Sequence, residues 1–498
     1  MAYAFQDQTR EVAALMTDFV GRAAGFYEHL SGQPVCRPAD SGTLRRIEEQ
    51  TIPVSGRPLR EVYEEMLRDV YSSTLLVQHP RSFACVPSTA SLLSWAGDVM
   101  TNAFNPHDSC RINAPAVARV EEKLIRWMCG LAGYPAEGGG LFVSGGSIAN
   151  LTALTAARDA KLTWEERGRG VVYVSEQTHA SVSKGLHIIG FSGDQIRVVP
   201  TDGAFRMEIS SLAEALREDL AAGRRPFAVV ASAGTTNTGS VDPLRDIAAL
   251  CREYDMWMHV DGAYGASVLL SERRREELAG IELSDSLSWD AHKWMMQTYG
   301  CSVVLVREQA ALARSFAAHP EYLKDSTSAE GGVEFWDLGP ELTRPARCLK
   351  LWLTLQALGS RAMGEAIDHG CAMAELAERE IARLPGWEVV SHARLGIVNF
   401  RCAPAGMPES ELDALNQTIS KELNSDGYAL IFTTELRGKT VLRMCVIHPQ
   451  TTEADIKETV RRLARCRAVQ ESLRKSQSHS PAPMSKREEG CPGRTASK

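Results

Sequence analysis

The spacing of hydrophobic residues divides the chain into segments of different kinds. From Thr9 to about Leu76 apolar positions recur with the helical period, which predicts an arm of amphipathic helices interrupted by a Pro- and Gly-bearing stretch. From Ala116 to Val306 short β-branched runs alternate with helical patterns. Apolar strands separated by helices are typical of a mostly parallel sheet covered on both faces, so this segment predicts an α/β domain. The predicted strands are LFVS, VVYV, QIRVV, FAVVAS, MWMHV and CSVVLV.

A smaller α+β unit is predicted to follow, entered through the helical stretch PELTRPARCLKLWLTLQALG. Its predicted strands are WEVV, GIVNF, YALIF and VLRMCVI, and its predicted helix is ESELDALNQTISKELN. After Val469 the sequence is rich in Ser, Pro and charged residues, a composition that cannot form a core and predicts disorder. The chain therefore divides into a helical arm (1–76), a large α/β domain (77–358), a small α+β domain (359–469) and a disordered tail (470–498).

Charge and cysteine content narrow the class of partner and compartment. Lys and Arg total 55 against 62 Asp and Glu, a net charge of -7, so nothing favours binding to nucleic acid or to an anionic membrane, and a small-molecule partner is expected. No apolar run approaches the roughly 20 residues of a membrane span. The 12 cysteines form no C-x-x-C pair, which indicates neither a disulfide framework nor a zinc site and favours a reducing cytoplasm.

Polar residues that follow the predicted strands are the candidates for chemistry, because ligands of an open parallel sheet bind beyond the carboxyl ends of its strands. After LFVS, Gly146 and Ser147 open a helix whose free N–H groups suit a phosphate, although Gly-Gly-Ser also makes a plain turn. After VVYV stands His179, a candidate catalytic group or a neighbour of a helix cap. Thr236 lies in the hydroxyl-rich loop after FAVVAS.

Asp261 ends an apolar strand and is followed by the small residues Gly262 and Ala263. A buried carboxylate is tolerated only beside a cation or strong hydrogen-bond donors, so either a positive group faces Asp261 or Asp261 caps the next helix. His259 and Asp261 form an H-x-D pair, but no further ligand stands at a suitable spacing, so no metal site is predicted.

The stretch SWDAHKWMM (288–296) places Lys293 among tryptophans and methionines. A lysine in this setting either lays its stem along apolar surface with its head in water, or loses its proton readily and acts as an amine nucleophile. One cofactor would use all of these groups. Pyridoxal phosphate has a phosphate for the Gly146 turn, a ring nitrogen for Asp261, a flat ring for His179 and an aldehyde for Lys293.

From about Val70 to Arg465 the sequence resembles the group II pyridoxal-phosphate-dependent amino-acid decarboxylases, the family of aromatic amino-acid, glutamate and sulfinoalanine decarboxylases. Gly262 and Ala291 depart from it, since the family usually has Ala at the first position and often Pro at the second. The motifs that carry the resemblance, in family order, are HPRSFACVPS (79–88), SGGSIAN (144–150), THAS (178–181), HVDGAYG (259–265), DAHKW (290–294), PEYLKD (320–325) and RPARCLKLW (344–352).

The resemblance implies a fold-type I architecture, an obligate homodimer whose active sites lie at the subunit interface, and an N-terminal arm that embraces the partner subunit. It assigns the Schiff base to Lys293, the ring-nitrogen contact to Asp261, the ring stacking to Ala263 and His179, and a place at the ring's polar edge to Thr236. It assigns the phosphate to Gly146, Ser147, Asp290 and His292.

The reaction that the resemblance implies is the conversion of an L-amino acid to its amine and carbon dioxide. Tyr322 matches a mobile catalytic loop and would protonate Cα, whereas the alternative is an ordinary loop tyrosine. A related branch produces aldehydes and typically has Phe for this Tyr or Asn for the stacking His, so Tyr322 and His179 favour the amine. Transamination and a non-catalytic binding role are disfavoured by the loop and by the presence of Lys293 and Asp261.

The substrate is expected to be an aromatic or large apolar amino acid. The segment HPRSFACVPSTASLLSW is predicted to line the substrate pocket, where Phe83, Pro87 and Trp95 would form an apolar wall. Arg443 either binds a substrate carboxylate or forms a structural ion pair. Acidic, diamino and branched-chain amino acids remain alternative substrates.

Overall fold

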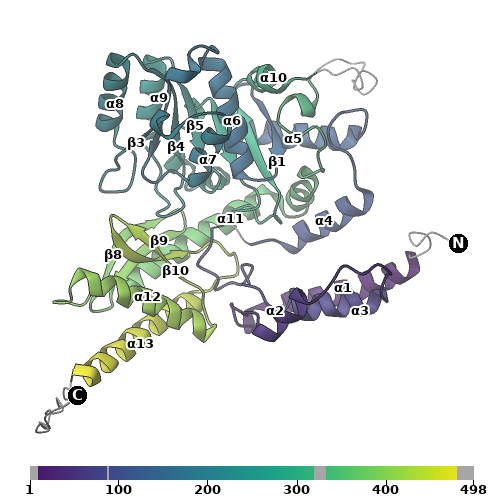
Figure 1. Cartoon of the computed structure of the whole chain (residues 1–498), viewed down its shortest axis with the longest axis vertical. Coiled ribbons are helices and arrows are strands. Elements are labelled where there is room, and N and C mark those ends of the chain that lie inside the picture. The colour runs from purple at the N-terminus through teal and green to yellow at the C-terminus, as the bar shows by residue number, and fades with distance from the viewer. Residues whose placement is uncertain (1–8, 87–88, 319–332, 479–498) are drawn as a thin grey trace, which may run out of the picture.

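The computed structural model describes residues 9–86, 89–318 and 333–478 and has three parts (Figure 1). A helical arm lies below a large domain built on a seven-stranded sheet, and a small domain built on a four-stranded sheet lies beside the arm. Within the described ranges, no helix is both long and apolar enough to cross a membrane.

The large sheet has the strand order β1-β7-β6-β5-β4-β2-β3. The strands from β6 to β3 run parallel, whereas β7 runs antiparallel to both of its neighbours. This arrangement confirms the predicted mostly parallel sheet. The strands are β1 (Gly139–Val143), β2 (Gly170–Ser175), β3 (Ile196–Val199), β4 (Arg225–Ser232), β5 (Trp257–Asp261), β6 (Ser286–Trp289) and β7 (Ser302–Val306).

Helices cover both faces of this sheet, which is why its strands read as continuous apolar runs. Successive residues of β2 belong to different cores: Val171 and Tyr173 pack on one face, and Val172 and Val174 on the other. Helices α6, α7 and α10 form one layer, and α5, α8 and α9 form the opposite one. The helices of this domain are α4 (Leu92–Phe104), α5 (Pro115–Leu131), α6 (Gly146–Lys161), α7 (Ala180–Ile188), α8 (Ile209–Ala221), α9 (Leu244–Glu253) and α10 (Ala310–Phe316).

Strand β6, with the sequence SLSW, is the one that the hydrophobic pattern missed. Its serines make it look like a loop, yet all of its residues are buried. The hydroxyl of Ser286 accepts a hydrogen bond from Trp257 Nε1 at 2.8 Å, and that of Ser288 donates to Asp261 Oδ1 at 3.2 Å. Buried hydroxyl groups are tolerated in the sheet because they have these partners.

The small domain packs a four-stranded antiparallel sheet against helices α11, α12 and α13. The long helix α11 breaks at Gly359, which adopts φ 78° and ψ 157°, and the predicted domain boundary at 358 falls at this break. The stretch YALIF was predicted as a strand, but β10 begins only at Phe432, because Leu430 pairs instead with the segment around Ser82. The elements are α11 (Cys348–Ala382), β8 (Trp387–Arg394), β9 (Ile397–Cys402), α12 (Glu409–Asp426), β10 (Phe432–Leu436), β11 (Lys439–Cys445) and α13 (Glu453–Ser478).

The two ends of the chain are helical. The arm contains α1 (Thr9–Glu28), α2 (Ser41–Glu48) and α3 (Leu59–Glu65), as the amphipathic pattern predicts. At the other end α13 continues past Val469, so the prediction of disorder from 470 onward is wrong as far as Ser478. Arg, Glu, Leu, Lys and Gln in this stretch are strong helix formers, and a helix can extend from a packed domain without a core of its own. The remainder of the predicted tail lies outside the described residues.

A buried ion pair holds the end of β1 next to the start of α6. Arg344 and Glu121 have fully buried side chains, with Nη2 and Oε1 separated by 2.7 Å. Arg344 also donates to Phe142 O at 2.8 Å, and Phe142 N donates to Glu121 Oε1 at 2.9 Å. These contacts immobilise the strand that leads into the loop at Ser144, which borders the candidate site.

Candidate active site

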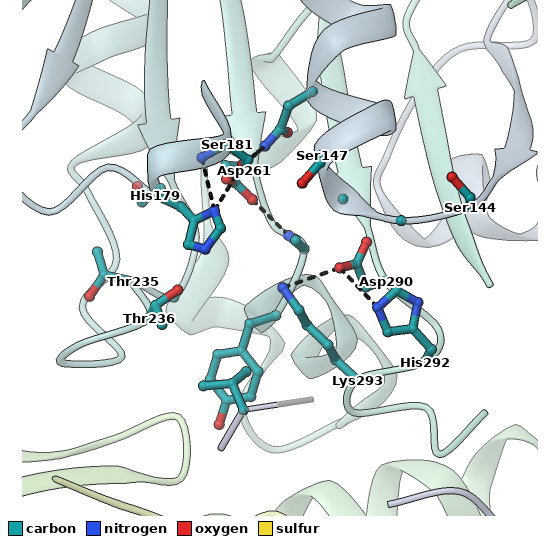
Figure 2. Close-up of a pocket in the computed structure, with 18 of the residues that line it drawn as sticks. Ser144, Ser147, His179, Ser181, Thr235, Thr236, Asp261, Asp290, His292 and Lys293 are labelled. Atoms are coloured by element: carbon teal, nitrogen blue, oxygen red, sulfur yellow. Dashed lines mark hydrogen bonds and ion pairs between the residues drawn. The ribbon is translucent and has the colours of Figure 1, made fainter. Parts of the chain in front are cut away.

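A cavity of about 330 Å³ opens at the carboxyl ends of the central strands. Figure 2 shows the side chains that converge on it: His179, Thr235 and Thr236 lie on one side, Ser144, Ser147, Asp290 and His292 on the other, and Lys293 and Asp261 between them. Loops that follow β1, β2, β4, β5 and β6 each contribute residues. Segments far apart in sequence meet here because the carboxyl ends of parallel strands lie along one edge of the sheet.

Lys293 lies in the loop after β6 and points its amine into the cavity (Figure 2). Its side chain is 16% exposed, and Nζ lies 3.1 Å from Asp290 Oδ2. The apolar residues next to Lys293 in sequence point away from the cavity, since Trp289, Trp294 and Met295 are buried in the core. An apolar frame therefore fixes the backbone, while the amine itself has a carboxylate partner.

Asp261 is buried at the end of β5 and its carboxylate is surrounded by donors. Oδ1 accepts from Ala263 N at 3.1 Å and from Ser288 Oγ at 3.2 Å, and Oδ2 accepts from Asn150 Nδ2 at 3.0 Å. Burial alone would raise the pKa of Asp261, but the nearby charge of Lys293 and these hydrogen bonds outweigh it and hold the pKa below its usual value. The group is therefore a carboxylate ion at neutral pH.

His179 caps the N-terminus of α7 with its ring. Nδ1 accepts from Ser181 N at 3.2 Å and lies 2.8 Å from Ser181 Oγ. His179 is therefore the cap itself and not the predicted neighbour of a cap, and this cap orients its ring toward the cavity (Figure 2).

The N-terminus of α6 forms a site suited to an anion. The first N–H groups of a helix have no acceptor within it, and Gly146 and Ser147 supply two of them at the cavity. A side chain at Gly146 would not fit, because its Cβ would lie 2.8 Å from Asp290 Oδ2 and 3.1 Å from Ala263 Cβ. His292 completes this corner, held by a contact of 3.0 Å between Nδ1 and Cys301 O, and burial lowers the pKa of its ring.

Comparison with known proteins agrees with this geometry. A family model described as the pyridoxal-dependent decarboxylase conserved domain matches residues 41–403. The chain is 40% identical over 430 residues to an aromatic-L-amino-acid decarboxylase from Bacillus atrophaeus, covering 86% of this chain and 89% of the relative. This chain belongs to the pyridoxal-dependent decarboxylase family. It is also 30% identical over 464 residues to a phenylacetaldehyde synthase from Arabidopsis thaliana, covering 91% of this chain and 94% of that enzyme.

The pyridoxal-dependent decarboxylase fold is likewise found among solved structures. The crystal structure of Oryza sativa TDC with PLP and tryptamine has a TM-score of 0.87 and 28% sequence identity, covering 94% of this chain and 99% of that one. The fold-type I expectation is therefore confirmed. The protein is a carboxy-lyase that uses pyridoxal phosphate to decarboxylate an amino acid.

The residues of this decarboxylase fit the cofactor. Asp290 Oδ1 is buried and has no hydrogen-bond partner among the described residues, beside a glycine whose missing side chain leaves a cradle. A cofactor with a phosphate, an aldehyde and a basic ring nitrogen matches the α6 N-terminus, Lys293 and Asp261 in turn. These are the residues that would hold it.

The structure brings together most of the predicted site residues. Those that line the cavity are Gly146, Ser147, His179, Thr236, Asp261, Ala263, Asp290, His292 and Lys293. Tyr322 and Pro87 lie outside the described residues. The metal alternative for His259 finds no support, because both of its ring nitrogens already contact Ser286 and Asn150.

Three predicted substrate residues lie elsewhere. Phe83 is buried in the core of the small domain, because its N–H pairs with Leu430 O and draws the segment into that domain. Trp95 packs edge-on against Phe19 of α1, with ring centroids 6.2 Å apart. Arg443 donates to Thr236 O at 2.9 Å and to Ala84 O at 2.5 Å, so its guanidinium braces two loops, and its role toward a substrate carboxylate stays a prediction.

Sequence reasoning missed other residues that line the cavity. Val86, Tyr264 and Tyr299 contribute apolar surface, and Asn150 lies at its base. Only Asn150 could have been identified from the sequence, because an amide side chain in a helix of small and apolar residues needs buried hydrogen-bond partners. Tyr299 could not, since its place depends on Lys350, whose Nζ binds the carbonyl oxygens of Thr298 and Tyr299 at 3.2 and 3.0 Å.

Replacing Lys293 should remove the attachment point of the cofactor. Borohydride reduction of the holoenzyme should leave the peptide that contains Lys293 heavier by one cofactor less a water plus two hydrogens, and Lys293→Ala should show no such adduct and no turnover. Lys184→Ala, at an exposed position of the neighbouring helix α7, is the matched control and should behave as the unmodified enzyme. Mass spectrometry of the reduced peptides measures both; an adduct that persists in Lys293→Ala would contradict the assignment.

Proposed function

We propose that this decarboxylase converts an aromatic L-amino acid to the corresponding amine, with Lys293, Asp261 and His179 as its central residues. The observation that carries the assignment is that Lys293 and the buried carboxylate of Asp261 face the same cavity, with a helix N-terminus at its edge. The aromatic preference is supported by the aromatic-L-amino-acid decarboxylase relative and by the solved structure with tryptamine.

Each group has a task that follows from its surroundings. When bound, pyridoxal phosphate supplies an electron-poor ring that accepts the electron pair of the breaking Cα–carboxylate bond. Asp261 holds a proton at the ring nitrogen, because three donors and Lys293 keep its carboxylate charged. His179 and Ala263 would orient the ring, and Gly146, Ser147 and His292 would bind the phosphate.

The walls of the cavity support an aromatic side chain better than an acidic one. Val86, Tyr264 and Tyr299 present apolar or aromatic surface. Tyr264 is rigid, since its ring stacks on Trp294 at 4.9 Å and 7° and its hydroxyl donates to Leu395 O. Arg443 donates to the backbone carbonyl groups of Thr236 and Ala84, which supports a bracing role for its guanidinium.

Aldehyde formation is the second candidate, because a phenylacetaldehyde synthase is among the relatives. The identities of Tyr322 and His179 favour the amine, since the aldehyde-forming branch typically replaces one or the other. We assign to Tyr322 the protonation of Cα after carbon dioxide leaves.

The chain is proposed to act as a homodimer. Its arm carries a stripe of exposed apolar residues on α1, formed by Val12, Met16 and Val20 at intervals of one helical turn. Helix α4, which contacts α1 through Trp95 and Phe19, also exposes the large apolar side chains of Met100 and Phe104. Apolar surface of this extent marks a protein interface, and a second copy is the proposed partner.

We infer a reducing compartment, in keeping with a cytoplasmic enzyme. The cysteines of the described residues are all free, and most are buried. Burial raises the pKa of Cys301 and Cys445 to about 12, which keeps both as inert thiols.

Incubation with a mixture of the proteinogenic amino acids, diaminobutyrate and sulfinoalanine should yield an aromatic amine as the main product. The apolar wall should favour aromatic over acidic side chains by about tenfold or more in kcat/KM, because burying a charge in it is costly. Mass spectrometry identifies the products. An amine from glutamate or diaminobutyrate alone would contradict the substrate class, and an aldehyde would contradict the reaction outcome.

Tyr322→Phe should divert the product from amine toward aldehyde and ammonia in the presence of oxygen. The change removes only the hydroxyl that protonates Cα, so binding of the cofactor should be unaffected. The measurement is the ratio of amine to aldehyde, and Tyr299→Phe, at the mouth of the same cavity, is the matched control. Undiminished amine output would show that another group is the proton donor.

Light scattering should give a mass of about twice the 54.5 kDa of one chain. Met16→Glu combined with Val20→Glu should lower this mass toward that of the monomer, because two charges would be buried in the interface. Ala14→Glu lies on the opposite side of α1 and is the matched control. A dimer that survives the double change would exclude this stripe from the interface.

A further inference from the structure

A single amide on α6 contacts Asp261 directly and reaches His179 through Ser181. Asn150 is 1% exposed and its Nδ2 donates to Asp261 Oδ2 at 3.0 Å and to Ser181 Oγ at 3.1 Å. Its Oδ1 lies 2.9 Å from His259 Nε2. One side chain therefore joins three partners, Asp261, Ser181 and His259.

The direction of every hydrogen bond on the Asp261 side is forced. A carboxylate ion only accepts, so the atom of Asn150 that faces Asp261 is the NH₂ group, and its oxygen faces His259. Burial lowers the pKa of His259 to about 4, so the ring is neutral and carries its one proton on Nε2. Nδ1 then accepts from Ser286 Oγ at 2.8 Å, and Ser286 accepts from Trp257 Nε1 at 2.8 Å.

The direction on the other side is forced as well. Ser181 Oγ accepts from Asn150, so its own proton is free to go to His179 Nδ1, 2.8 Å away. The backbone N–H of Ser181 donates to the same nitrogen at 3.2 Å. Nδ1 of a neutral His179 is thus an acceptor, and its proton lies on Nε2, the nitrogen turned away from Ser181.

We propose that Asn150 is a positioning residue that holds the carboxylate of Asp261 and, through Ser181, the Nε2–H form of His179. This deepens the proposed function, because it rests on the roles assigned there to Asp261 and His179. Loss of the amide removes a donor from a buried ion and releases the hydroxyl of Ser181. One change therefore disturbs both the group that keeps a proton on the ring nitrogen and the group that stacks on the ring.

The network predicts how the affinity for the cofactor depends on Asn150. Asn150→Leu keeps the volume and removes the donor, and should weaken binding of pyridoxal phosphate to the apoenzyme by about tenfold or more, as expected for a hydrogen bond to a charged group. Asn150→Asp places a second carboxyl group against Asp261. Two carboxyl groups in contact share a proton, so this variant should bind poorly at high pH and recover toward the unmodified affinity on acidification.

The titratable groups that face Asp261 are His259 on its own strand and Lys293 from the loop after β6. Both are retained in every Asn150 variant, so the comparison is made as the ratio of variant to unmodified affinity at each pH. A ratio cancels the effect of pH on His259, Lys293 and the cofactor itself. The acid-dependent recovery of Asn150→Asp then reports the new carboxyl pair, which a purely structural role of Asn150 would not produce.

Fluorescence titration of the full-length apoenzyme with pyridoxal phosphate between pH 6 and 8.5 is the test. Thr152→Val is the matched control, since Thr152 is a fully buried polar residue of the same helix whose hydroxyl binds Ile148 O and takes no part in the network; its ratio should stay near one. Asn150→Asp has the shape of the original residue, so the pH dependence of its cofactor affinity tests the positioning role of Asn150 even if Asn150→Leu does not fold.

Asp261→Asn, measured in the same titration, distinguishes a failure of the role proposed for Asp261 from a failure of the role proposed for Asn150. If it binds the cofactor as tightly as the unmodified chain, the role of Asp261 in the proposed function fails. If it binds weakly while both Asn150 variants stay within about twofold of the unmodified affinity at every pH, only the positioning role of Asn150 fails. A constant weakness of Asn150→Asp across the pH range would also overturn it, since that result indicates damaged packing.

Discussion

The burial of a carboxylate ion at the end of β5 is the constraint on which the rest of the site depends. A charge in that position is stable only if donors and a cation surround it, and the sheet and its loops supply both. Ser288 comes from the neighbouring strand β6, Asn150 from the helix above the sheet, and Lys293 from the loop after β6. The stability of this one buried charge thus requires particular residues on several elements.

The need for hydrogen-bond partners around this charge also explains why polar residues are found in the core. Ser286 and His259 are fully buried, and each has a partner on the path from Trp257 to Asn150. A buried polar network is favourable only when every member is satisfied, which here leaves a single arrangement of protons. Rigidity of this kind suits the proposed task of the site, which is to hold a flat ring between His179 and Ala263.

The sequence predicted well what depends on neighbours along the chain. The apolar runs predicted six of the seven strands, and the residues after them included Gly146, His179 and Asp261, whereas Lys293 was identified from its apolar neighbours in sequence. Strand β6 was not predicted because its serines form hydrogen bonds with residues of another strand, and a local sequence pattern contains no information about such partners. The positions of Phe83 and Trp95 were not predicted for the same reason. Each residue is apolar, and only the packing of the small domain and of the arm decides which apolar surface it joins.

By itself the sequence determined the class of fold and the chemistry of the cofactor, because strand periodicity and the residue types at strand ends are local properties. The tertiary structure decided which side chains share the cavity and which way each hydrogen bond runs. Arg443 illustrates the difference, since its charge is evident in the sequence but its engagement with the carbonyl groups of Ala84 and Thr236 is not. Contacts between residues distant along the chain depend on how domains and layers pack, and only the folded chain specifies them.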